Sequence, residues 1–174
     1  MPRRRLVSGL CLLIGMTLAG TARFHGARVR TASPDGVARL QQRLPHLPVV
    51  DYAGRPVDLA LAARGRKSVI VFFSDSCHSC QEVLPELLPF PRSLRLIMVN
   101  EAPGKAQFHP HTAGLEEALQ LRDPNRVLVR SFPMSGMPTI LFVDEGGVLR
   151  EALVGTRARG RLRQKLTEFV GGED

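Results

Sequence analysis

The sequence has no tryptophan, and Tyr52 is its single tyrosine. Proteins that bind single-stranded nucleic acid stack bases on aromatic side chains within a basic groove, and no basic run here alternates with aromatic residues. The 24 Lys and Arg residues nevertheless exceed the 16 Asp and Glu residues, which gives a net charge of +8. We interpret this excess as an arginine-rich, solvated surface and expect no nucleic-acid partner.

Cysteine is also scarce, with three in 174 residues. Cys11 lies inside an apolar N-terminal stretch, so that Cys77 and Cys80 are the two that remain for a folded domain. One pair is too few for a scaffold of several disulfides or for a four-cysteine zinc site. Hydrophobic residues make up 44% of the chain, which is enough to build a packed core.

The first 22 residues have the layout of a secretory signal or a membrane anchor. Arg3–Arg5 form a positive start, and residues 6–22 carry no charge and end in small residues. A spanning helix needs about 17–25 apolar residues, so this stretch is at the lower limit, and cleavage after Ala22 is the other reading. The positive-inside rule places the arginines in the cytoplasm and the rest of the chain outside. We therefore expect a periplasmic protein, or one held on the outer face of the cytoplasmic membrane.

Apolar runs and turn residues predict an α/β domain over residues 47–174, after a linker at 23–46 that contains at most a short helix around Val37–Leu44. Predicted strands are a hairpin at 49–59 with Pro56 on an edge strand, buried strands at 68–73, 94–99 and 139–143, and a strand at 148–154. Predicted helices begin at the cysteine pair, cover 115–121, and begin at a Thr156 cap. This order is typical of an α/β sandwich around a central sheet.

The strongest chemical motif is Cys77-His78-Ser79-Cys80, which follows a predicted buried strand and opens a predicted helix. Free backbone N–H groups at a helix start stabilise a thiolate, and the thiolate is the attacking species in disulfide exchange. We predict that Cys77, nearest the helix start, is the nucleophile and that Cys80 resolves the mixed disulfide. The alternatives are a pair of structural thiols or half of a metal site.

The arrangement of strand, Cys-x-x-Cys and helix, followed by Gly136-Met137-Pro138-Thr139 and a hairpin, resembles the thioredoxin family over residues 47–170. The resemblance implies a thioredoxin-like three-layer α/β/α sandwich with a mixed central sheet. It also implies that Pro85 kinks the first helix and that Pro138 is a cis-proline which, with Met137, positions the substrate. The leader, the early hairpin and the helix expected near 113–121 resemble the exported TlpA, ResA and MauD branch.

Several positions depart from the family pattern. Ser76 stands where the family usually has a tryptophan, and Val71 stands where thioredoxin has a buried aspartate. Cytochrome-maturation members often place a glutamate where this chain has Val83, and here Glu82 comes one residue earlier. These departures favour the MauD-like type.

Further polar residues lie near the motif or in a predicted loop. We expect His78 and Ser79 to tune the cysteine pair, because a protonated His78 would stabilise a Cys77 thiolate. Asp75 is expected to be a solvated acid ahead of the helix. His109 and His111 form a His-x-His pair that would suit copper or zinc together with thiolates, but we expect no metal site.

The predicted function is therefore that of a thiol–disulfide oxidoreductase without a cofactor, acting through Cys77 and Cys80 on the thiols and disulfides of exported proteins. The resemblance favours reductive work in the maturation of a redox protein or a cytochrome, with a membrane electron donor as a possible partner. One alternative is a copper metallochaperone that uses Cys77, Cys80 and a histidine, although copper-delivery relatives usually space their cysteines by three residues. A redox-silent interaction module is the other.

Overall fold

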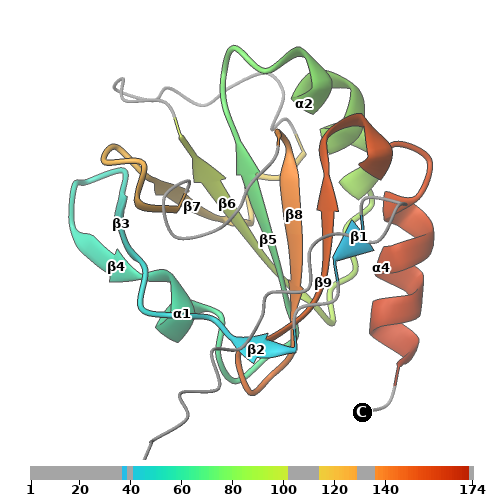
Figure 1. The fold of residues 1–174 in the computed structure, drawn as a ribbon, viewed down its shortest axis with the longest axis horizontal. Helices are drawn as coiled ribbons and strands as arrows, with labels where there is room; N and C mark the ends of the chain where they lie inside the picture. Colours follow the sequence, from blue (N-terminus) through green and yellow to red (C-terminus); the bar gives the residue numbers. More distant parts are fainter. Residues whose placement is uncertain (1–36, 39–40, 102–113, 129–135, 173–174) are drawn as a thin grey trace, which may run out of the picture.

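The protein is described by a computed structural model that covers residues 37–38, 41–101, 114–128 and 136–172 (Figure 1). The strands are β1 (Val37–Ala38), β2 (Gln42–Arg43), β3 (Pro48–Asp51), β4 (Pro56–Asp58), β5 (Ser68–Phe73), β6 (Arg95–Asn100), β7 (Leu119–Arg122), β8 (Thr139–Val143) and β9 (Val148–Val154). The α-helices are α1 (Leu59–Ala62), α2 (His78–Val83) and α4 (Leu162–Gly171), and the 3-10 helices are η1 (Leu84–Leu87) and η3 (Gly155–Ala158).

The described strands form one mixed sheet in the order β1-β9-β8-β5-β6-β7-β3-β4, and β2 also pairs with β9. At its centre β5 runs parallel to β6 and antiparallel to β8. Every residue of β5 and β8 is buried, as the continuous apolar runs predict. The predicted mixed central sheet is confirmed.

Alternate residues of the central strands build two separate cores. Val71 and Phe73 of β5 pack in a cluster with residues of α2, η1 and α4. Ile70 and Phe72 pack on the opposite face with α1 and the segment 44–49. The period of two along a strand therefore sends neighbouring side chains into different layers, which is the predicted α/β/α sandwich.

Both predicted hairpins are present. β3 and β4 pair antiparallel, and β4, which begins with Pro56, lies at the edge of the sheet. The turn between them needs Gly54, whose φ of 82° is in the region that favours glycine. β8 and β9 also pair antiparallel, and Asp144 closes their turn by accepting a hydrogen bond from the Val148 N–H at 2.7 Å.

The helix predicted over 115–121 is wrong. Residues 119–122 form β7, which runs parallel to β6 and antiparallel to β3. Leu121 is completely buried, while Leu119 is 40% exposed, as in a strand with one buried face. The segment is too short for a helix with a wide apolar face, and its backbone is satisfied on both sides by fixed neighbouring strands.

The short helix suggested around Val37–Leu44 is also wrong, because β1 and β2 pair with β9. The sheet therefore begins before residue 47. Leu44 is buried, and its N–H donates to the Gly147 carbonyl at 2.9 Å. Edge pairing with β9 satisfies backbone groups that a short, isolated helix would leave exposed.

Thr156 does not cap the last helix. It is exposed within η3, and α4 begins at Leu162 after Arg161, without a side-chain cap. Leu162 and Leu166 are buried as predicted, but Val170 is 41% exposed and lies off the packed face.

The predicted signal or anchor at residues 1–22, including Cys11, lies outside the described residues. Within the described ranges, no helix has the length and apolar character needed to cross a bilayer.

Candidate active site at the Cys77–Cys80 disulfide

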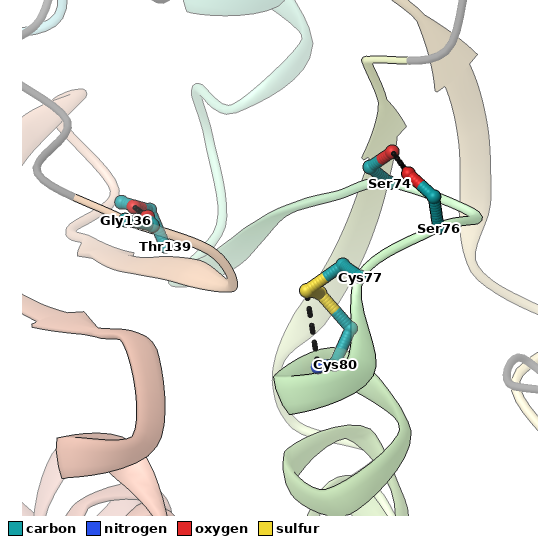
Figure 2. Close-up of a disulfide and its surroundings, with 6 residues drawn as sticks. All are labelled: Ser74, Ser76, Cys77, Cys80, Gly136 and Thr139. Carbon is teal, nitrogen blue, oxygen red and sulfur yellow. Dashed lines mark hydrogen bonds between the residues drawn. A yellow bond between two sulfur atoms is a disulfide. The ribbon is translucent and has the colours of Figure 1, made fainter.

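Cys77 and Cys80 form a disulfide at the start of α2, with their Cα atoms 5.3 Å apart. The loop from the central strand β5 delivers them there, and its turn is closed by the Cys77 N–H, which donates to the Ser74 carbonyl at 3.0 Å. Figure 2 shows the disulfide at the first turn of α2, with Ser74 and Ser76 in the loop that precedes it. The sequence prediction of a joined pair at a strand-to-helix junction agrees with this structure.

The two sulfurs have different surroundings. Cys77 is the N-cap residue and is partly exposed, and its sulfur accepts a hydrogen bond from the Cys80 N–H at 3.1 Å (Figure 2). Cys80 is completely buried. The N–H group that now contacts the Cys77 sulfur is in place to stabilise a thiolate on that sulfur after reduction.

The surroundings of Cys80 are apolar. Cys80 belongs to the same buried cluster as Val71, Val83 and Leu84. Val71 therefore occupies the core beside the cysteine where the family's buried acid would lie, as the sequence comparison indicated. A base for Cys80 therefore has to be another group or water.

The segment before β8 contains a cis Met137–Pro138 peptide bond, as the family resemblance implied. Pro138 is buried, and its carbonyl accepts a hydrogen bond from the Gly155 N–H at 2.7 Å. The Thr139 hydroxyl donates to the Gly136 carbonyl at 2.7 Å, and Figure 2 shows both residues where this segment enters β8. Met137 and Cys77 are both partly buried and pack against one apolar cluster. A second cis bond, Leu88–Pro89, was not predicted.

The exposed side of α2 carries polar and charged residues. His78 is exposed, and its Nε2 lies 3.7 Å from Glu82 Oε1. Glu82 also accepts a hydrogen bond from Arg159, the residue after η3, at 3.2 Å. Glu82 thus links α2 to the end of η3. Ser79 is partly buried between the cysteines.

The expectation for Asp75 is wrong, because this acid is partly buried and bonded rather than freely solvated. Its Oδ1 accepts a hydrogen bond from Asn100 Nδ2 at 2.7 Å. Asn100 is completely buried at the end of β6 and was missed from the sequence. The available signal was a polar residue directly after an apolar strand run, beside the strand that leads to the cysteines.

His109 and His111 lie outside the described residues. Over the ranges that the structure covers, His, Cys, Asp and Glu side chains nowhere gather in a group of three or more that would hold a metal ion.

A mixed sheet with a Cys-x-x-Cys disulfide at the start of a helix, and a cis-proline before an antiparallel strand, defines a thioredoxin-fold thiol–disulfide oxidoreductase. The sequence agrees: the family model of the thioredoxin-like domain matches residues 58–169, and the chain belongs to that family.

Solved structures with the same fold share little sequence with this chain. A putative thiol:disulfide interchange protein DsbE from Chlorobium tepidum is 18% identical with a TM-score of 0.59, over 75% of this chain and 94% of that one. A secreted Mycobacterium tuberculosis disulfide oxidoreductase, homologous to E. coli DsbE, is 13% identical with a TM-score of 0.55, over 70% and 95%. The exposed lipoprotein thioredoxin Etrx1 of Streptococcus pneumoniae is 18% identical with a TM-score of 0.50, over 71% and 99%. No curated protein matches the sequence.

Proposed function

We propose that this protein reduces disulfides in exported proteins by dithiol–disulfide exchange through Cys77 and Cys80. The observation that carries the proposal is the disulfide between a partly exposed sulfur at a helix N-cap and a completely buried sulfur one turn later. Two solved structures of the same fold are described as a secreted oxidoreductase and as an exposed lipoprotein, which supports work outside the cytoplasm.

The exchange has two steps. The Cys77 thiolate attacks one sulfur of the substrate disulfide, which forms a mixed disulfide and releases the other substrate sulfur as a thiolate. Cys80 then loses its proton and attacks Cys77, which releases the second substrate sulfur and forms the Cys77–Cys80 disulfide. Two electrons pass to the substrate, and a dithiol electron donor, which we place in the membrane, must return them.

We assign supporting roles to the residues around the pair. Pro138 and Met137 position the substrate backbone, since Met137 shares an apolar cluster with Cys77 and Gly155 holds the Pro138 carbonyl. His78 and Ser79, which lie between the cysteines, tune the stability of the Cys77 thiolate. Because His78 is exposed and close to Glu82, its effect is modest.

We further propose that residues 1–22 export the domain, either as a cleaved signal or as an anchor. The residues up to 36 would then link that segment to the sheet, which begins at Val37. This arrangement leaves the domain at the outer face of the membrane or free in the periplasm, where maturing redox proteins and cytochromes present disulfides.

A turnover experiment tests the proposal. The reduced full chain is mixed with an excess of a peptide that carries one disulfide, and peptide thiols are counted while a dithiol regenerates the enzyme. The proposal predicts reduction by the natural chain and none by a Cys77→Ser, Cys80→Ser double variant. The copper-delivery alternative predicts instead a one-to-one copper(I) complex that replaces the redox cycle, and no peptide reduction.

A further inference from the structure

We propose that Asp75 is a positioning residue for the cysteine pair. Asn100 holds its carboxylate in place, and the negative charge of that carboxylate makes the Cys77–Cys80 dithiol a stronger reductant. The inference rests on the proposed function and names a residue that regulates it. A fixed negative charge beside Cys77 destabilises the thiolate of that cysteine, and a less stable reduced form gives up its electrons more readily.

Asn100 holds the Asp75 carboxylate from a rigid position. It is completely buried at the end of β6, where it pairs with Phe73 of β5 and Arg122 of β7. Its carbonyl accepts a hydrogen bond from the Asp123 N–H, next to β7, at 2.9 Å, so that its backbone is held from both sides. The 2.7 Å bond from Asn100 Nδ2 to Asp75 Oδ1 therefore ties the active-site loop to the sheet.

Asp75 lies close to Cys77 in space as well as in sequence. Each step between consecutive Cα atoms is about 3.8 Å, so the Cα atoms of these residues are at most about 7.6 Å apart. The turn from Ser74 to Cys77 shortens that path, and the Ser74 and Ser76 hydroxyls, 3.3 Å apart, draw it together (Figure 2). Each side chain reaches less than about 3 Å from its Cα atom, so the carboxylate is within roughly 13 Å of the Cys77 sulfur, a separation on the order of 10 Å.

Other charged groups surround Asp75. The Arg122 guanidinium lies 5.6 Å from the centre of the Tyr52 ring. Burial raises the pKa of the Tyr52 hydroxyl and the Asp75 carboxylate raises it further, while Arg122 and a hydrogen bond with Asn100 lower it. Tyr52 thus stays neutral, and Arg122 offsets a part of the Asp75 charge. On α2, the Glu82 carboxylate lies 3.2 Å from the Arg159 guanidinium, which offsets its charge.

The charge has two consequences for exchange. It raises the pKa of Cys77, which shifts the equilibrium of the pair from dithiol toward disulfide. It also leaves the thiolate more nucleophilic, because the nucleophilicity of a thiolate falls as its pKa falls. Both effects suit a reductant.

The decisive variant is Asp75→Asn, which removes the charge and keeps an oxygen that accepts the hydrogen bond from Asn100. At a pH where Cys77 of the reduced pair is a thiolate, Coulomb's law at on the order of 10 Å and a dielectric constant of roughly 20 to 80 gives a two- to fifteenfold shift toward the dithiol in glutathione buffers. Tenfold corresponds to about 30 mV. The pH midpoint for alkylation of Cys77 in the reduced protein is expected to fall as well, and added salt is expected to shrink both differences.

Two further variants separate charge from shape. Glu145→Gln removes an exposed acid from the β8–β9 turn, away from the disulfide, and is expected to shift neither measurement. Asp75→Ala removes both charge and hydrogen bond and is expected to shift the equilibrium at least as far as Asp75→Asn. If only Asp75→Ala shifts it, the hydrogen bond acts without the charge and the proposal is overturned. An unchanged Asp75→Asn equilibrium, or a shift toward the disulfide, overturns it too. If the natural chain forms no reversible Cys77–Cys80 disulfide, the proposed function itself fails, which is a different outcome.

Discussion

The Cys77 sulfur is partly exposed and accepts a hydrogen bond from the Cys80 N–H at 3.1 Å, whereas the Cys80 side chain is completely buried. Both residues belong to one helical turn, so this difference comes from where α2 meets the sheet (Figure 1). A large partner can reach the first sulfur and is kept from the second. The order that we propose for the two steps of exchange rests on this difference in exposure.

Replacing the buried cysteine should trap substrates. In Cys80→Ser, Cys77 can still attack a substrate disulfide but nothing resolves the product, so mixed disulfides accumulate on a non-reducing gel. Cys77→Ser is the matched control and is expected to trap at least tenfold less, because Cys80 is buried. Equal trapping by both variants would contradict the assignment of Cys77 as the nucleophile.

The support of the Pro138 segment can be tested at Gly155. Gly155 has a φ of 61°, and its N–H holds the Pro138 carbonyl at 2.7 Å. An alanine there adopts a left-handed conformation at a cost of about 1–2 kcal/mol, which urea unfolding of Gly155→Ala measures. The same change at Gly171, which ends α4 and has open space around it, should cost nothing. An unchanged free energy of unfolding for Gly155→Ala would show that the segment tolerates the strain.

Glu86 links η1 to the turn before α4. Its two carboxylate oxygens accept hydrogen bonds from the Gly160 N–H at 2.8 and 3.0 Å. Glu86→Ala is expected to lower the free energy of unfolding by about 1–2 kcal/mol, since hydrogen bonds to charged groups are the stronger ones. Glu117→Ala, at an exposed acid, is the control and should change stability by less than about 0.5 kcal/mol. Equal effects in urea unfolding would mean that the Glu86 contact contributes no stability.

The sequence alone predicted the centre of this fold well and its margins poorly. β5 and β8 are buried on both faces, so their continuous apolar runs predict strands directly. The turn around Gly54 needs a glycine. The run around Leu121 has no such constraint: its strand conformation depends on β3 and β6, which lie far away in sequence. The pairing of β1 and β2 with β9 depends on the same kind of distant partner.

At the site, too, features set by neighbouring residues were predicted and contacts with distant residues were not. Spacing and context sufficed for Cys77 and Cys80, because their chemistry is set by neighbours along the chain. The contact between Asp75 and Asn100 joins the loop after β5 to the end of β6, 25 residues away, and only the parallel pairing of β5 and β6 brings them together. The hydrogen bond from Arg159 to Glu82 likewise joins the residue after η3 to α2.

Stability at high pH should depend on Lys165. Its Nζ lies 2.8 Å from Glu168 and 3.3 Å from Glu151. The hydrogen bond with Glu168 raises the pKa of Lys165 above 10.5, and Glu151 adds to this while burial opposes it. Because this pKa is higher in the folded than in the unfolded state, protonated Lys165 contributes its full stabilisation below pH 10.5. That stabilisation is lost as the pH rises through the folded-state pKa.

Lys165→Met should therefore be less stable than the natural chain near neutral pH, by about 0.5–1 kcal/mol because solvent screens part of the interaction. The difference should narrow as the pH rises beyond 10.5. Urea unfolding of both chains over that range measures it. A difference that stays constant with pH would mean that the lysine contributes packing rather than charge.

The reduction potential of the Cys77–Cys80 pair tests the central claim most directly. The full chain is equilibrated in glutathione buffers of known potential, and its thiols are trapped and counted. A reductant should have a potential near or below about −250 mV, close to the roughly −270 mV of thioredoxin. A potential near −120 mV would make the protein an oxidant that installs disulfides. No reversible disulfide at all would contradict the account from its first step.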